Sequence, residues 1–313
     1  MQTKNNFSFF QKWNIYQSSR FPVIKHSLLI LAFSSCAVSY SAMSNGNPQT
    51  HFLSYLVAFI TCLLFFLQLR IADEFKDYEE DCLYRNYRPV PQGIITLKEL
   101  KNLFIISGCI QLILAFYLNT KLIPFLFLTW LYLFCMSHEF GIRSWLKAHP
   151  VSYLLSHMLI MPLIDFYATS TDWINYLSSP AHSLYWFVAL SFFNGINLEI
   201  GRKIRSPDDE EKGVETYSFL WNRKRACTAW IFAVALTGLC SIGAAFYLNT
   251  FFFFTMIIFV SSYLTLCIFM SKSFIKKPFK GRGKTFENLS GIFTLLIYLL
   301  LGLIPYFSFL IGK

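Results

Sequence analysis

The sequence predicts an all-α integral membrane protein with nine transmembrane helices, arranged as two parallel four-helix repeats followed by a ninth helix. Composition, the length of the apolar runs and an internal repeat support this prediction. Of the 313 residues, 55% are hydrophobic and 19% are aromatic, but only 14% are charged. Because about 25% of the residues in a soluble protein are charged, lipid must be the solvent for most of this chain.

Nine apolar runs are each long enough to cross the roughly 30 Å hydrocarbon core of a bilayer. They lie at residues 22–43, 52–71, 102–119, 121–142, 151–168, 182–200, 227–247, 250–270 and 289–311. Since backbone polar groups in lipid must be satisfied within the spanning structure, uninterrupted runs of this length indicate helices rather than barrel strands. We therefore expect a short tail at residues 1–21 and a single membrane-embedded domain at residues 22–313.

Positive charge predicts the orientation of these helices. All 27 Lys and Arg residues except Lys121 and Lys313 fall on one side of the predicted spans. The cytoplasmic side usually carries such an excess, so we expect a multi-pass protein of the bacterial inner (cell) membrane with a cytoplasmic N-terminus. This bias, together with attraction to anionic lipid, explains the net charge of +10. Neither nucleic-acid binding nor an obligatory protein partner is indicated.

A repeated hexapeptide indicates two related halves. Residues 115–120 and 245–250 both read Ala-Phe-Tyr-Leu-Asn-Thr, each at a tight turn between two predicted helices. A polar segment precedes each copy, at residues 73–93 and 199–213. We therefore predict halves at about residues 22–142 and 151–270 in the same orientation, with the ninth helix at about 289–311. Parallel repeats of this kind can enclose a cavity at their interface.

The first polar segment contains three aspartates at every fourth position, Asp73, Asp77 and Asp81. On a helix this spacing places the three carboxylates along one stripe. A hard divalent cation would relieve their repulsion, and Mg²⁺ takes oxygen ligands and bridges to substrate phosphates. A solvated helix face is the alternative, but the stripe continues a spanning helix at the bilayer edge, where ionisable groups are costly and usually functional.

The second polar segment extends the sixth predicted helix, and Pro207 predicts a break within it. Its candidate metal ligands are Glu199, Asp208 and Asp209. Across both segments, the candidate cations for a diphosphate are Arg70, Arg88, Arg202, Lys203 and Arg205. Facing acidic clusters with interleaved cations suit a magnesium-bound diphosphate, because the metal holds the bridging oxygens and guanidinium groups hold the terminal ones.

The topology and both segments resemble the UbiA-type membrane prenyltransferase superfamily. Its first motif, Asx-x-x-x-Asp-x-x-x-Asp followed by an Arg-Pro-x-x-x-Gly loop, is similar to Asp73, Asp77 and Asp81 followed by residues 88–93. Its second motif, an acidic run closing on Gly-hydrophobic-x-Ser/Thr, is similar to residues 208–216. The resemblance covers the whole chain in topology.

The sequence departs from the family at the Asp-x-x-x-Asp pair of the second motif. The corresponding residues are Glu199 and Lys203, with Arg202 beside the lysine. A lysine cannot ligate magnesium. Either the acidic ligand has moved to Asp208 or Asp209, or Arg202 and Lys203 bind the diphosphate directly and less metal is bound on this side.

The resemblance implies Mg²⁺-dependent transfer of a polyprenyl group from an allylic polyprenyl diphosphate to an unidentified membrane-associated acceptor. Asp73, Asp77, Arg88 and Lys203 are the expected catalytic residues. A terpene cyclase of the same superfamily would use the same diphosphate chemistry. A membrane transporter is the non-enzyme alternative, but its site would lie near the bilayer midplane, whereas both polar segments lie at one face.

Other polar residues in the predicted spans give further candidates. His138 and Glu139, at the end of the fourth predicted helix, are candidate acceptor-side residues together with Asn197. An ion pair between Glu139 and Arg143 is the structural alternative. Asp165 and Asp172 are expected towards the opposite face, in solvent.

Overall fold

A computed structural model describes residues 7–46, 50–176, 179–211 and 213–312, and every regular element among them is a helix. This confirms the predicted all-α fold class. The first half of the chain forms α1 (Phe9–Arg20), α2 (Val23–Ser44), α3 (Phe52–Lys76), α4 (Tyr78–Tyr84), α5 (Leu97–Leu118), η1 (Thr120–Leu122), α6 (Ile123–Ser137), η2 (Glu139–Gly141) and α7 (Arg143–Ala148). The second half forms α8 (Pro150–Met158), α9 (Ile160–Trp173), α10 (Ser183–Arg202), η3 (Pro207–Asp209), α11 (Tyr217–Leu220), α12 (Arg223–Phe246), α13 (Thr250–Lys276), α14 (Lys284–Leu301) and α15 (Leu303–Ile311).

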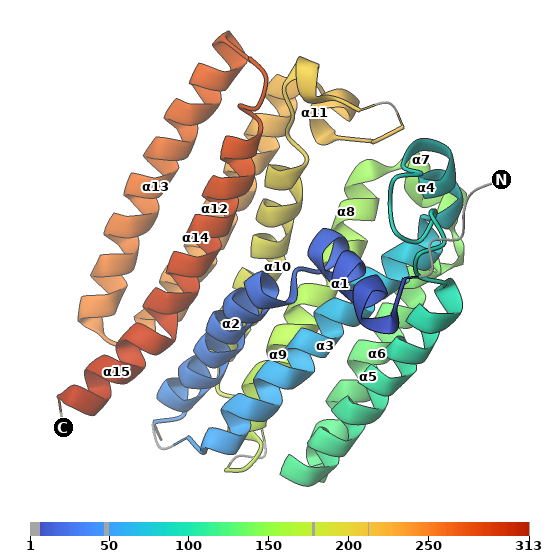
Figure 1. Ribbon diagram of the computed structural model, residues 1–313. Coiled ribbons are helices and arrows are strands. Elements are labelled where there is room, and N and C mark those ends of the chain that lie inside the picture. Colours follow the sequence, from blue (N-terminus) through green and yellow to red (C-terminus); the bar gives the residue numbers. More distant parts are fainter. Residues whose placement is uncertain (1–6, 47–49, 177–178, 212, 313) are drawn as a thin grey trace.

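Eight helical segments of the described chain are long and apolar enough to cross a membrane. They are α2, α3, α5, η1 with α6, α8 with α9, α12, α13, and α14 with α15. The expected count of nine is not confirmed by this criterion, because α10 falls outside it. With 20 residues α10 is long enough, but Asn194, Asn197 and Glu199 lower its mean hydropathy. Figure 1 shows α10 running within the bundle beside α12 and α14, and it packs against both.

The two hexapeptide copies form corresponding turns. The first copy ends α5, and the Asn119 side chain accepts a hydrogen bond from the backbone N–H of Lys121 at 3.0 Å. The second copy ends α12, and Asn249 caps α13 by accepting from the N–H of Phe252 at 2.9 Å. In both halves, therefore, an asparagine side chain satisfies a free backbone donor where one spanning helix gives way to the next.

The polar connections gather at one end of the bundle. Figure 1 shows α4, α7 and α11 at the same end, with the C-terminus at the other. We call this the cationic end, because the connections that follow α3, α6, α10 and α13 lie there and, together with the helix ends that flank them, hold most of the Lys and Arg residues. The two polar segments therefore share one end of the molecule, as the charge distribution predicts.

The N-terminal tail forms a helix that packs against the first half. Ser8 caps α1, and Tyr16 is buried against α3 and α5. Arg20 forms an ion pair with the buried Glu74 of α3, and the Lys12 ammonium lies 3.8 Å from Glu99 of α5. These contacts fix α1 next to the first polar segment.

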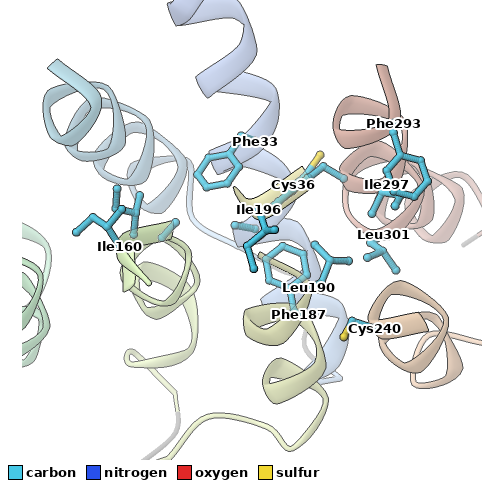
Figure 2. Packing of buried hydrophobic residues seen from close by; sticks show 14 of the residues in the cluster. Phe33, Cys36, Ile160, Phe187, Leu190, Ile196, Cys240, Phe293, Ile297 and Leu301 are labelled. Atoms are coloured by element: carbon cyan, nitrogen blue, oxygen red, sulfur yellow. The ribbon is translucent and has the colours of Figure 1, made fainter. Parts of the chain in front are cut away.

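One hydrophobic core joins both halves and the last helices. Figure 2 shows Phe33 of α2, Phe187 of α10 and Phe293 of α14 among the side chains of this core. Nearby, the Tyr40 hydroxyl donates to the carbonyl oxygens of Ser183 and Ala244, at 3.2 and 3.0 Å. Residues from both halves thus contribute to the same hydrophobic core.

The expectation that Asp165 and Asp172 face solvent is wrong. Both are at most 1% exposed. Asp165 accepts a hydrogen bond from the Tyr298 hydroxyl of α14, and Asp172 accepts from Ser41 at 2.9 Å and from Thr50 at 3.1 Å. Each buried carboxyl group thus has at least one hydroxyl partner from elsewhere in the chain, while Oδ1 of Asp165 has no hydrogen-bond partner among the described residues.

Two predicted spans are interrupted helices. The fifth span divides into α8 and α9, and the ninth divides into α14 and α15 at Gly302. Gly302 lies directly against α2: a Cβ atom there would be 2.4 Å from the Cα of Cys36 and 2.5 Å from its carbonyl oxygen. Only a residue without a side chain permits this close approach of two backbones.

We expect Gly302→Ala to destabilise the protein by about 1–3 kcal/mol, because the backbone atoms of Cys36 would have to move. Gly291→Ala in the same helix is the control, since a Cβ there meets no atom within 4 Å. Its better helix propensity should leave stability unchanged or raise it by about 1 kcal/mol. Thermal unfolding in detergent measures both, and equal melting temperatures for the two variants would contradict the α2–α14 contact.

Candidate active site

The three aspartates of the first polar segment follow a helix that is interrupted at the middle one. α3 ends at Lys76, and α4 begins after Asp77. Backbone hydrogen bonds from Asp77 N to Asp73 O (2.9 Å) and from Asp81 N to Asp77 O (2.8 Å) keep the three residues one turn apart. The expectation of a continuous helix is therefore wrong, but the three aspartates keep the one-turn spacing that a helix would give them. The break has a physical reason: acids are unfavourable at the end of α3 and favourable in the first turn of α4.

The three carboxyl groups have different surroundings. The Asp73 side chain is 40% exposed and lies 3.7 Å from Arg70 and 3.8 Å from Lys76. Asp77 is half-buried; burial raises the pKa of its carboxyl group, and the positive charge of Lys76 partly offsets this. Asp81 is 2% exposed and forms ion pairs with Arg85 and Arg88. Asp73 and Asp77 are thus the more available carboxylates, whereas Asp81 is occupied by arginines.

The loop that follows, residues 88–93, folds as a compact turn. The N–H of Gln92 donates to the Arg88 carbonyl at 3.0 Å, and that of Gly93 donates to the Val90 carbonyl at 2.9 Å. Gly93 has φ = +70°, a conformation that favours glycine. Val90 is buried against α1 and α5. The turn therefore anchors the backbone of Arg88 beside Asp81.

In the second polar segment, Glu199 is already neutralised. It lies in the last turn of α10, 2.6 Å from the Arg202 guanidinium and 3.0 Å from the Lys203 ammonium. The Lys203 ammonium also lies 5.5 Å from the centre of the Tyr217 ring. With two cations on one carboxylate, this side of the site has a net positive charge.

The remaining candidate residues of the second segment, Arg205, Asp208 and Asp209, lie away from Glu199, Arg202 and Lys203. Arg205 pairs with Glu211 at 2.9 Å, and Asp209 accepts a hydrogen bond from the N–H of Gly281, in the loop between α13 and α14, at 2.7 Å. Asp208 is exposed. Within the described ranges, none of Arg205, Asp208 and Asp209 contacts the first segment. The structure brings Glu199, Arg202 and Lys203 together and leaves these three outside the cluster.

Lys76 links the first segment to α8. Its ammonium donates to the Tyr153 hydroxyl at 2.7 Å and lies 3.8 Å from both Asp73 and Glu139. The ring of His157 stacks on Tyr153 with 3.9 Å between centroids, and its Nε2 is buried without a hydrogen-bond partner in the part of the chain that the structure describes. Sequence reasoning missed Lys76 and Tyr153 as site residues, because one lysine in an acidic run and one tyrosine in an aromatic-rich span give no distinct signal.

α8 lies next to both segments. Its Tyr153 accepts a hydrogen bond from Lys76 of the first segment at 2.7 Å. α8 packs against α10. The resulting cluster has open carboxylates on the α3 side and paired cations on the α10 side.

Of the three candidate acceptor-side residues, only Glu139 joins this cluster. It is 3% exposed and lies beside Lys76. The alternative pair with Arg143 does not form, because α6 ends at Ser137 and η2 follows with φ = +52° at Glu139. His138 is exposed, and its ring lies tilted against that of Phe134, with 4.3 Å between the centroids. Asn197 is buried and accepts from Ser290 of α14 at 3.0 Å.

Comparison with known proteins identifies the family of this chain. The model of the UbiA prenyltransferase family matches residues 30–297. The chain belongs to this family. A comparison with curated proteins gives no match.

Solved structures of this family share the fold. An apo UbiA homologue from Aeropyrum pernix K1 is 17% identical, with a TM-score of 0.66 over 89% of this chain and 96% of its own. A digeranylgeranylglyceryl phosphate synthase is 16% identical, with a TM-score of 0.61 over 93% and 97%. A UbiA homologue from Archaeoglobus fulgidus bound to DMAPP and Mg²⁺ is 12% identical, with a TM-score of 0.54 over 89% and 97%. The UbiA fold is thus common to all four chains.

The donor set of the cluster fits magnesium better than a metal held by protein alone. Within the described residues, no group of three or more His, Cys, Asp or Glu side chains is placed to hold a metal ion. Mg²⁺ is commonly bound by one or two carboxylates, with water and substrate phosphates completing the shell. Asp73 and Asp77, one turn apart, offer that arrangement in this UbiA family member.

We expect Tyr153→Phe to lower kcat/KM for a prenyl diphosphate by at least about tenfold, because Lys76 loses its shortest hydrogen bond and can move away from Asp73. Tyr132→Phe is the control, since its hydroxyl donates to the Ser156 carbonyl instead. Steady-state kinetics with matched melting temperatures make the comparison. Equal kinetics for the two variants would show that Tyr153 does not hold Lys76 for catalysis.

Proposed function

We propose that this chain catalyses Mg²⁺-dependent transfer of a polyprenyl group from an allylic polyprenyl diphosphate to a membrane-associated acceptor. Membership of the UbiA prenyltransferase family supports this reaction class. Two structures of a relative, the UbiA homologue from A. fulgidus, hold Mg²⁺ with DMAPP or GPP. The observation that carries the proposal for this chain is the pair Asp73 and Asp77, available at the end of the bundle that also holds Arg202 and Lys203.

In this proposal Asp73 and Asp77 hold the metal and the cations hold the diphosphate. When bound, Mg²⁺ neutralises the charge that develops on the leaving group. Arg202 and Lys203 contact the terminal phosphate oxygens as charge-assisted donors. Asp81 acts as a positioning residue, because it fixes Arg85 and Arg88 beside the site.

The bond that breaks joins the allylic carbon to the diphosphate oxygen, and both electrons leave with the diphosphate. The allylic cation then forms a bond with a nucleophilic atom of the acceptor, which loses a proton. The aromatic rings of Tyr153 and Tyr217 border the cluster and can stabilise the cation by cation–π contact. We place the cluster on the cytoplasmic side of a bacterial inner membrane, with residues 22–313 as one domain.

The direct test is incubation of purified protein and Mg²⁺ with a panel of polyprenyl diphosphates, with and without a membrane lipid extract as the source of acceptor. When the extract is present, we expect both diphosphate release and a prenylated lipid. Without the extract, we expect neither. A cyclic terpene formed without extract would instead indicate a cyclase. No diphosphate release with any chain length would refute the proposal.

We expect Asp73→Asn to abolish diphosphate release, because the variant keeps the shape of the side chain but loses a metal-binding charge. Asp208→Asn is the control: it removes the same charge at the same end of the protein, from an exposed residue outside the cluster. Release assays across a Mg²⁺ titration compare them. Near-native turnover of Asp73→Asn would remove this residue from the metal site, and loss of turnover in Asp208→Asn would move the site towards η3.

We expect Lys203→Gln to weaken binding of the prenyl diphosphate by about tenfold to a hundredfold, the effect of losing one charge-assisted contact to phosphate. Arg205→Gln should change it little, because Arg205 pairs with Glu211 away from the cluster. The activity of the Lys203→Asp variant should be lower still, and more Mg²⁺ should be needed to restore it. If Lys203→Asp were as active as the wild type at unchanged Mg²⁺, Lys203 would not face the diphosphate.

A further inference from the structure

A group of exposed cations lies at the cationic end of the second half, apart from the candidate active site. Arg223, Lys224 and Arg225 begin α12, and Lys272, Lys276 and Lys277 lie in the last turns of α13. In the described part of the chain none of the six forms an ion pair, whereas Arg70, Lys76 and Arg88 of the first polar segment all do. Within the described residues, therefore, no acidic side chain forms an ion pair with these exposed cations.

Two adjoining depressions run from these cations towards the apolar part of α12. The first, of about 580 Å³, has Arg223 and Lys224 at one side and the apolar side chains of Phe219 and Ile275 at the other. The second, of about 560 Å³, shares Lys224 and continues past Ala229 to Phe232. Since α12 spans the membrane, the second depression leads from the polar end into the depth of the acyl chains.

The acidic residue in the first depression does not supply the missing counter-charge. Glu210 accepts hydrogen bonds from the hydroxyls of Thr216 and Ser218, both at 2.8 Å. Its carboxylate is thus directed at the loop between η3 and α11. The cations of α12 remain available for an anion from outside the chain.

We propose that this surface binds an anionic phospholipid, with the phosphate at Arg223 and Lys224 and an acyl chain along Ala229 and Phe232. The charge of the first depression is complementary to a lipid phosphate, and basic pockets at the ends of spanning helices suit such headgroups. The second depression ends at the apolar side chains of Ala229 and Phe232, which suit a ligand with a hydrocarbon chain rather than a nucleic acid or an acidic protein. Phe232 is 63% exposed on a spanning helix, so lipid contacts it directly.

The site adjoins the loop that serves the candidate active site. Residues 203–222 carry Tyr217, whose ring contacts Lys203, and also Glu210 and Phe219 of the first depression. A lipid held there packs against this loop from the side opposite Lys203. Binding should therefore raise the melting temperature of the protein.

The test measures binding of phosphatidylglycerol and phosphatidylcholine of equal chain length to the full chain in detergent, by native mass spectrometry and thermal shift. We expect Arg223→Gln/Lys224→Gln to weaken phosphatidylglycerol binding by about thirtyfold, the effect of losing two cations near a lipid phosphate. Lys98→Gln/Lys101→Gln is the control, because it removes two exposed cations from the start of α5 at the same end. Its affinity should stay within about threefold of the wild type.

Three results would overturn the proposal: equal binding of the two lipids by the wild type, equal loss in both double variants, or equal stabilisation by glycerol phosphate or a short DNA duplex, which have no acyl chain. If the double variant unfolds early without lipid, Lys224→Gln alone gives the same comparison, since this residue lines both depressions. Its expected loss is about fivefold. Unchanged binding in that variant would equally refute the site.

Discussion

The contact on which the candidate site depends is that of Lys76 with Asp73, Glu139 and Tyr153. The ammonium is 13% exposed at the edge of the bilayer, where an unpaired charge would be costly. Its three partners come from α3, from the turn after α6 and from α8. Because Glu139 is buried, any arrangement that separated it from Lys76 would leave an uncompensated carboxylate. The contacts of Lys76 therefore link the end of α3 to η2 and to α8.

The two polar segments differ in the charges that they present to the site. On the α3 side, Asp73 and Asp77 are more available than Asp81, and the nearest cations are about 4 Å away from Asp73. On the α10 side, Glu199 is in close contact with Arg202 and Lys203. One side can attract a cation and the other an anion. A metal-bound diphosphate has both charges, so an asymmetric pair of segments suits it without a second carboxylate pair.

Sequence patterns predicted the elements and the local neighbours but not the partners across helices. Helical spacing placed Glu199 beside Lys203 and kept Asp73, Asp77 and Asp81 in register, because residues four apart share a face. It could not show that Tyr298 donates to Asp165, or that Ser41 donates to Asp172, since these pairs are 133 and 131 residues apart. The expectation that both aspartates are solvated failed for this reason.

The same limit applies to Asn197, for which the sequence does not indicate the contact with α14. Asn194 and Asn197 lower the hydropathy of α10, and α14 supplies the hydroxyls that satisfy them: Thr294 donates to Asn194 at 2.8 Å and Ser290 donates to Asn197 at 3.0 Å. Two residues along a helix correspond to about 200° of rotation. Since Asn197 is held against α14, Glu199 must point to a different side of α10, where it pairs with Arg202 and Lys203. α14 thus orients the second polar segment through a contact that lies outside the site.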